Sequence, residues 1–294
     1  MHVVFGASGR AGGETAKALL AMGAPVRVVL RRADQAEAWQ ASGADVALAD
    51  MTDPDAIAAA LQGAAGAFFL NPPPVSGDLF RSTEVIGTAL AEGVRRAGLR
   101  KAVVLSSVGA QHASGTGVIA TLHQMEALLT GIAPATAFLR PGYFVETWSE
   151  VLEAVLGDGL LPTFVEPDRK MPMVSTIDVG STAAALLRED WAGQRVVELG
   201  GPHDWSARDV AKAFATVLGR PVDPVFVPEA DRLPVYARAG VPGPVAEALI
   251  GMYDGIARGR VAREGGKEER RGSTSLLTAV ARIVDDAGKR RSMA

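Results

Sequence analysis

The sequence contains no cysteine, although it runs to 294 residues. Disulfide bonds, thiolate nucleophiles and cysteine-ligated metals are therefore excluded. Histidine is also scarce, with four in the chain and none paired at the spacing of a helical metal-binding motif. Because thiolate and imidazole are the usual ligands of zinc, we expect no metal site.

A basic excess and long apolar runs are missing as well. The formal net charge is −3, whereas proteins that bind nucleic acid usually gather lysine and arginine on one face. No apolar run reaches the length of a membrane span, and no signal peptide precedes the apolar residues that begin at Val3. We therefore expect a cytoplasmic protein whose partner is a small molecule, not nucleic acid or a membrane, and homodimer formation stays open.

Short apolar segments alternate with helical patterns through the first half of the chain. Strands are predicted at residues 3–5, 26–30, 46–48, 67–70, 102–105 and 136–139. Helices are predicted between them at residues 11–21, 33–41, 54–61, 79–97 and 119–129. This β-α-β rhythm, with strands that are apolar throughout, predicts a doubly wound α/β fold of the Rossmann type, whose parallel sheet is buried on both faces.

The rhythm loosens after about Tyr143. Two more strands are predicted at residues 173–175 and 195–199, with helices at 179–187, 207–218, 230–238 and 245–257. The charged, glycine-rich segment 262–273 predicts a mobile surface loop before a final helix at 275–286. We divide the chain into a Rossmann domain, residues 1–145, and a smaller C-terminal α/β lobe, residues 146–294, which caps the sheet and is partly integrated with it.

A glycine-rich segment joins the first predicted strand to the first helix. It consists of Gly6, Ala7, Ser8, Gly9, Arg10, Ala11 and Gly12. Glycines let the backbone approach a pyrophosphate, and a helix N-terminus offers free N–H donors and partial positive charge. The spacing is GxxGxxG rather than GxGxxG, so a tight turn without a ligand is the alternative. The β-α-β context favours a dinucleotide cofactor.

The second predicted strand ends at Arg31 and Arg32, where a protein that prefers NAD carries an acid for the adenosine ribose. The first acid here is Asp34, beyond the turn. Guanidinium groups match a phosphate in charge and in forked geometry. We therefore expect NADP(H), with Arg31 first and Arg32 second on the 2′-phosphate and Arg10 as a further candidate. Solvated surface arginines are the alternative interpretation.

Further cofactor contacts are expected where the third and fourth strands end. Asp50 and Met51 follow the third strand, near the expected adenine, although Asp50 is equally well explained as a turn residue. Asn71, Pro72 and Pro73 follow the fourth strand. A proline run cannot continue a strand, so it forms a stiff wall, either beside the cofactor ribose or simply as a rigid loop.

The order of several motifs resembles the NmrA-like family of atypical short-chain dehydrogenase relatives. The motifs are GASGRAGG at the start, VLSS at 104–107, LRPGYF at 139–144, VSTIDVG at 174–180, LGGP at 199–202 and LGRP at 218–221. The resemblance implies a Rossmann domain and a small lobe with NADP(H) in the cleft between them. The family includes NADPH-dependent quinone reductases, nitro- and azo-reducing relatives, and redox sensors that bind the cofactor without turning it over.

The Tyr-x-x-x-Lys pair of conventional short-chain dehydrogenases is missing, because none of the three tyrosines has lysine four residues later. In the corresponding helix, Ile119 replaces the tyrosine and His123 the lysine, while Glu126 fits the acid that the family pattern expects. His123 is a candidate to hold the nicotinamide ribose or pass a proton, and a packing role is equally plausible. Reduction of an ordinary carbonyl through Tyr and Lys is disfavoured.

The remaining candidates follow the fifth and sixth strands. Ser106 and Ser107 lie at the carboxyl edge, where one is expected on ribose or substrate and the other in the loop. Pro141, Gly142, Tyr143 and Phe144 are expected to wall the nicotinamide or join the lobes. Arg140 is expected on an anion or in the lobe junction, and Asp178 as a helix cap. A few of five apolar residues are expected to contact substrate: Trp148, Phe164, Met171, Met173 and Tyr236.

Together these features favour an NADPH-dependent oxidoreductase that passes hydride to a quinone or another flat, conjugated acceptor. His123, Ser107 and Tyr143 are the catalytic candidates. A non-catalytic NADP(H) sensor acting through protein partners, and a biosynthetic reductase or isomerase, are the alternatives. A pocket large enough for a flat ring favours the enzyme, and a closed cleft favours the sensor.

Overall fold

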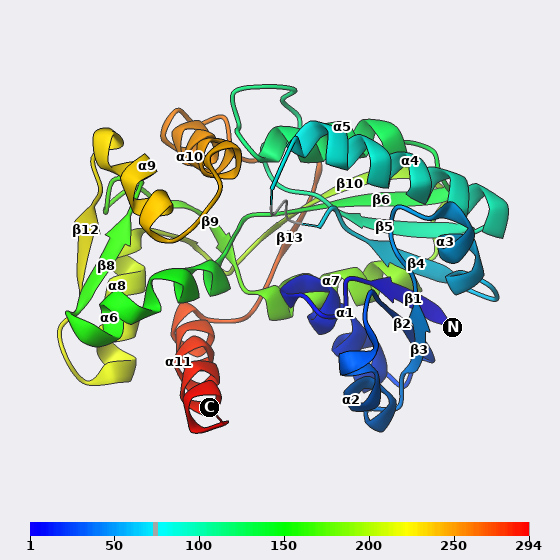
Figure 1. Cartoon of the computed structure of the whole chain (residues 1–294), viewed down its shortest axis with the longest axis horizontal. Coiled ribbons are helices and arrows are strands. Elements are labelled where there is room, and N and C mark those ends of the chain that lie inside the picture. Colours follow the sequence, from blue (N-terminus) through cyan, green and yellow to red (C-terminus); the bar gives the residue numbers. More distant parts are fainter. Residues whose placement is uncertain (73–75, 294) are drawn as a thin grey trace.

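The computed structural model describes residues 1–72 and 76–293, so Pro73 lies outside the described residues. Figure 1 shows two parts: a broad sheet covered by helices, and a smaller lobe built mostly from the second half of the chain. Across the described residues, no helix is both long and apolar enough to cross a membrane.

The central sheet has eight strands in the order β13-β10-β6-β5-β4-β1-β2-β3, and every neighbouring pair is parallel. The strands are β1 (His2–Phe5), β2 (Val26–Leu30), β3 (Asp45–Leu48), β4 (Gly66–Phe69), β5 (Lys101–Leu105), β6 (Ala135–Pro141), β10 (Gly193–Gly200) and β13 (Glu268–Arg271). The expected doubly wound fold is thus confirmed. The order reverses between β1 and β4, and ligands of such sheets bind at the carboxyl ends of the strands at that point.

Helices cover both faces of this sheet (Figure 1). One face carries α1 (Arg10–Ala21), α2 (Ala36–Ala41), which follows the short 3-10 turn η1 (Ala33–Gln35), and α7 (Thr176–Arg188). The other carries α3 (Pro54–Ala60), α4 (Leu79–Ala97) and α5 (Ile119–Leu129). Because side chains alternate along a strand, Val4 packs toward α1 while Val3 and Phe5 pack toward α3 and α4.

The smaller lobe has its own apolar core, centred on Phe214, Leu161 and Val280. It contains η2 (Val145–Val151), α6 (Leu152–Gly157), β8 (Leu160–Thr163), α8 (Ala207–Leu218), β12 (Asp223–Phe226), α9 (Glu229–Arg238), α10 (Gly243–Ala257) and α11 (Leu276–Met293). Strand β8 pairs with β12. Strands β7 (Tyr143–Phe144), β9 (Met171–Val174) and β11 (Asp204–Trp205) form a small sheet beside the central one.

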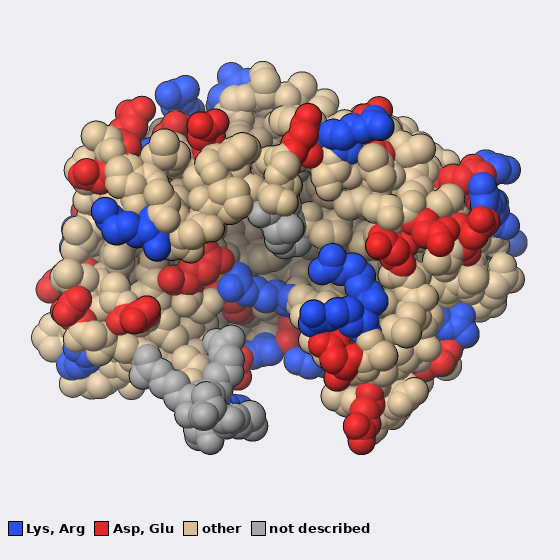
Figure 2. Space-filling view, in the orientation of Figure 1, with Lys and Arg blue, Asp and Glu red and all other residues tan. Residues whose placement is uncertain are grey.

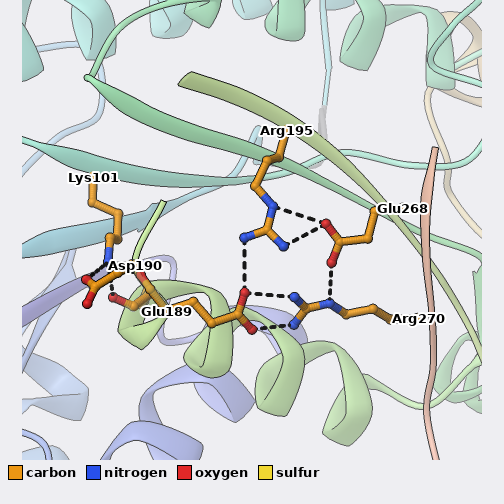
Figure 3. Close-up of polar contacts among 7 residues, drawn as sticks. Lys101, Glu189, Asp190, Arg195, Glu268 and Arg270 are labelled. Carbon is orange, nitrogen blue, oxygen red and sulfur yellow. Dashed lines mark hydrogen bonds and ion pairs between the residues drawn. The ribbon is translucent and has the colours of Figure 1, made fainter. Parts of the chain in front are cut away.

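The expected mobile loop at 262–273 is wrong for its second half, because residues 268–271 form the edge strand β13. Charged side chains hold this strand, as Figure 3 shows. Arg195 on β10 donates to Glu268 at 2.6 Å and to Glu189 at 3.0 Å. Arg270 donates two hydrogen bonds to Glu189, at 2.7 and 2.8 Å. Glu268 and Arg270, two of the charges that suggested a solvated loop, are therefore paired, and β13 completes the sheet.

Candidate active site

The glycine-rich segment forms a tight loop from β1 into α1, and its three glycines serve different purposes. Gly6 has φ +68°, and a Cβ there would lie 2.6 Å from Leu70 Cδ2. A Cβ on Gly12 would lie 2.3 Å from the carbonyl oxygen of Gly6. A Cβ on Gly9 would meet only that same oxygen, at an ordinary 3.4 Å. The fold thus requires Gly6 and Gly12, whereas Gly9 leaves open space of the kind that a ligand needs above the loop.

The positive end of α1 faces this space. The helix begins at Arg10, its N-cap residue Gly9 has no capping side chain, and its first turn contains no acid. The first N–H groups of a helix have no partner within the helix, so those of Arg10, Ala11 and Gly12 are suited to an anion. Ala7 and Ala11 are buried beneath the loop and Ser8 is exposed. This donor set is suited to a pyrophosphate.

The three arginines expected near the 2′-phosphate differ in their partners. Arg32 donates to Asp34 at 2.8 Å, and Arg10 donates to Ser149 at 3.0 Å and lies 3.7 Å from Glu150. Within the described part of the chain, no hydrogen bond or ion pair holds exposed Arg31. Figure 2 shows the hollow between the two parts of the molecule, with lysine and arginine side chains gathered at its edge. Arg31 is therefore the arginine most available to a phosphate.

The residues after β3 and β4 have mainly structural contacts. Asp50 accepts hydrogen bonds from the backbone N–H and the hydroxyl of Thr52, each at 2.8 Å. These bonds, more than the nearby charge of Arg31, hold the pKa of the Asp50 carboxyl below its usual value. Met51 is buried in the core beneath α3. Asn71 donates to Thr83 at 2.9 Å, while Pro72 is half-buried.

A buried ionic cluster lies behind the end of β5. The Ser106 hydroxyl donates to Glu126 at 2.5 Å, and Arg140 donates to both oxygens of Glu126, at 2.8 and 2.6 Å. Arg140 also donates to Glu264 at 2.6 Å. The Ser106 side chain therefore faces the interior, and Arg140 joins α5 to the segment before β13.

Ser107, by contrast, opens onto a small cavity between the two parts of the molecule. The cavity lies among Ser107, Val108, Ile119, Tyr143, Met171, Pro172, Met252, Ile256 and Val261. It encloses about 30 Å³, which is room for one or two water molecules. Ile119, at the position where conventional relatives carry the acid tyrosine, presents only hydrocarbon here. A flat ring would enter only if flexible side chains such as Met171 and Met252 turn aside.

His123 lies on α5, one turn after Ile119. Its Nδ1 contacts the carbonyl oxygen of Ala110 at 2.8 Å. Because a carbonyl only accepts, Nδ1 must carry the proton, which leaves Nε2 as the acceptor in the neutral ring. His123 is thus arranged to accept a hydrogen bond from a hydroxyl, such as one on a ribose.

All three tyrosines of the chain gather beside the cavity. The hydroxyls of Tyr143 and Tyr253 are 2.9 Å apart. The ring of Phe164 packs edge-on against Tyr236 and Tyr253, with centroids 5.4 and 5.1 Å away. Burial raises the pKa of all three phenols, so they stay protonated at neutral pH.

Several expected residues serve the junction between the two parts instead. Gly142 packs so closely on β9 that a Cβ there would lie 2.4 Å from the Pro172 carbonyl oxygen. Pro141 is buried, and Phe144 packs on the core beneath α1. Asp178 was expected to cap a helix, but Ser175 caps α7. Asp178 accepts hydrogen bonds from the backbone of Ser273 and Thr274, and so ties α7 to the segment after β13.

A model of the NmrA-like family matches residues 2–262. The chain belongs to the NmrA-like family. It is 24% identical over 255 residues to the NAD(P)H azoreductase of Xenophilus azovorans, covering 86% of each chain. It is also 24% identical over 261 residues to quinone oxidoreductase 2 of Escherichia coli K12, covering 88% of this chain and 89% of that protein.

Solved structures share the fold of this NmrA-like protein. The E. coli NADPH-dependent quinone oxidoreductase complexed with NADPH superposes with a TM-score of 0.80 and 22% identity, covering 97% of this chain and 100% of that one. The Citrobacter sp. triphenylmethane reductase complexed with NADP(H) gives a TM-score of 0.75 and 21% identity, covering 97% and 99%. The family and the Rossmann-type architecture expected from the motifs are thus confirmed.

The sequence missed the contribution of α10 to the cavity of this NmrA-like protein. Met252 and Ile256 line the cavity, and Tyr253 contacts Tyr143, yet α10 was expected only as a cap helix. Of the five apolar candidates for substrate contact, Met171 lines the cavity and Tyr236 joins the tyrosine cluster. The other three pack inside: Trp148, Phe164 and Met173. The only sequence signal for this cluster was that all three tyrosines lie after residue 140.

Proposed function

We propose that this protein is an NADPH-dependent oxidoreductase that reduces a quinone or a similar flat, conjugated acceptor. The observation that carries the proposal is an edge of the sheet with groups suited to the phosphates of a dinucleotide, which lies beside an apolar cavity. The uncapped N-terminus of α1, the open space at Gly9 and the free guanidinium of Arg31 lie at the carboxyl ends of β1 and β2. Ser107 and Tyr143 open onto the cavity nearby.

The cofactor is held by groups with separate tasks. The backbone N–H groups of Arg10, Ala11 and Gly12 bind the pyrophosphate, and Arg31 binds the 2′-phosphate. His123 accepts a hydrogen bond from the nicotinamide ribose through Nε2. When bound, the reduced nicotinamide supplies hydride.

The substrate lobe, residues 146–294, completes the site in this proposal. Met171 and Pro172 come from β9, and Met252 and Ile256 from α10, so the acceptor is held between the lobes. Apolar walls suit a flat ring and exclude water. Because Ile119 replaces the tyrosine of the conventional Tyr-Lys pair, the acceptor is one that delocalises the charge left by hydride, such as a quinone. The azoreductase and quinone oxidoreductase relatives support this acceptor class.

The test is NADPH oxidation by the purified protein against a panel of quinones, azo dyes and enones. Turnover with quinones and none without acceptor is the expected result. Isothermal titration with NADPH, done in parallel, separates failure to bind from failure to react. Tight NADPH binding with no acceptor in the panel would defeat the enzyme proposal.

One observation favours a second candidate, an NADP(H)-sensing protein without turnover. The cavity of about 30 Å³ is too small for a flat ring while Met171 and Met252 keep their positions. A sensor needs only the cofactor edge and a surface that changes with cofactor state. Binding that differs between NADPH and NADP⁺, without turnover, would support this function.

A further inference from the structure

The hydroxyls of Tyr143 and Tyr253 form a short row that ends at the cavity. Tyr143 comes from β7 and Tyr253 from α10. The two oxygens are 2.9 Å apart, and either of them can be the donor. If Tyr253 donates to Tyr143, the proton of Tyr143 remains free for the cavity.

The position of α10 is fixed by glycines, so Tyr253 is not placed by chance packing. A Cβ on Gly117 would lie 2.2 Å from both the Ala248 carbonyl oxygen and the Met252 nitrogen. A Cβ on Gly251 would lie 3.0 Å from the Gly117 Cα. Val118 donates its backbone N–H to Ala248 at 2.8 Å. The helix therefore sits directly on the loop after β5 that carries Ser107.

Quinone reduction needs a proton as well as hydride. The acceptor gains two electrons and one proton as hydride and becomes a hydroquinone anion, whose oxygen then needs a second proton. The position of the conventional acid is apolar Ile119, and the Ser107 hydroxyl donates to its neighbour's carbonyl at 3.0 Å. Tyr143 is thus the phenol available at the cavity among the described residues.

We propose that Tyr143 is the acid of this reaction and that Tyr253 is the relay that supplies its proton. This inference rests on the proposed function. The O–H bond of Tyr143 breaks as its proton moves to the acceptor oxygen. Tyr143 then takes the proton of Tyr253, and water restores the proton of Tyr253. The hydrogen bond from Tyr143 also stabilises the negative charge that develops on the acceptor oxygen.

The test compares two acceptors that differ in their need for a proton. Naphthoquinone requires hydride and a proton, whereas a cationic triarylmethane dye becomes neutral on taking hydride alone. Tyr143→Phe should lower the ratio of quinone to dye turnover by about 100-fold, since one donor to an oxyanion is typically worth that much. Tyr253→Phe should lower the ratio by about 5- to 10-fold, because it removes one neutral hydrogen bond to the donor Tyr143.

A packing control separates chemistry from damage to the fold. Trp148 lies beside Tyr143, with ring centroids 6.0 Å apart, but its side chain has no hydroxyl. Trp148→Phe should leave the ratio of the two turnovers unchanged, whatever it does to either rate. If the tyrosine variants slow both acceptors equally, or slow neither, the relay is wrong while the proposed function stands. If the unaltered protein reduces neither acceptor, the proposed function fails and the relay fails with it.

A second measurement needs no turnover. The anion of 2-hydroxynaphthoquinone carries the type of oxygen that Tyr143 is proposed to face, and neutral naphthoquinone does not. In the cofactor-free protein, Tyr143→Phe should weaken binding of the anion by about 10-fold, the lower end for a hydrogen bond to a charged group. Binding of the neutral quinone should change by less than about twofold. Equal loss for both ligands contradicts the proposal.

Discussion

Replacing Arg31 with alanine should weaken NADPH binding selectively. Arg31 has no competing partner among the described side chains, so its guanidinium is free for the 2′-phosphate. A hydrogen bond to a charged group is worth about 1.5–3 kcal/mol, or about 10- to 150-fold in Kd. Because Arg31 is exposed, solvent screening places the loss in the lower part of that range, at about 10- to 30-fold. NADH, which lacks the phosphate, should bind as before.

Arg32→Ala is the matched control. Arg32 is adjacent and is also exposed, but its pair with Asp34 at 2.8 Å must break before it reaches a phosphate. Its loss should cost less than about threefold in NADPH affinity. Isothermal titration of both cofactors with the three proteins measures this, and the Arg31 effect should shrink at high salt. Equal affinity of the unaltered protein for NADPH and NADH would refute the reasoning, as would a larger effect for Arg32 than for Arg31.

Three more predictions concern the loop, the histidine and the edge strand. Gly9→Val should abolish binding of NADPH and NADH in titrations. The circular dichroism spectrum should stay unchanged, because a Cβ there meets no protein atom closer than 3.4 Å. Normal cofactor binding by this variant would show that the loop is misassigned. His123→Ala should raise the KM for NADPH and change kcat by less than about 10-fold, since Nε2 is placed to accept a hydrogen bond. A fall in kcat of about 100-fold would show that His123 is a proton donor instead. Glu189→Gln should lower the free energy of unfolding by about 1–2 kcal/mol at pH 7. This figure already allows for solvent screening, because the Glu189 side chain is 36% exposed. Hydrogen bonds from Arg270 lower the pKa of Glu189 from 4.5 to about 2, so this difference in denaturant unfolding should shrink as the pH falls from 4.5 toward 2, and a constant difference contradicts the pairing.

The central sheet was predictable because its signals are local. The sequence predicts the observed ends of α4, Leu79–Ala97, since an apolar stripe runs between the Asp78 N-cap and the left-handed Gly98. Strand β2 consists of five residues, four of them apolar, that are buried or half-buried and bounded by turns. The glycine-rich loop is recognised from seven consecutive residues, 6–12. In each case, neighbours in the chain contain the information.

Features built from distant segments were not predictable. Strand β13 reads Glu-Glu-Arg-Arg, which has low strand propensity, and only its pairing with β10 and the ionic contacts to Glu189 and Arg195 make it a strand. Tyr143 and Tyr253 are 110 residues apart in the chain and meet only because two glycines let α10 approach the loop after β5. No pattern within one segment predicts such a meeting.

The placement of β10 and β13 has a consequence for how the chain is made. Strand β6 ends at Pro141, its neighbour β10 begins at Gly193, and β13 ends at Arg271. During synthesis the edge of β6 therefore stays uncovered while about fifty further residues emerge, and the sheet is complete only when β13 has emerged as well. An exposed strand edge pairs readily with other chains. A ribosome that stalls between these points would thus release a fragment prone to aggregate, whereas the finished sheet covers the edge of β6 with β10 and ends in β13, a strand of charged residues.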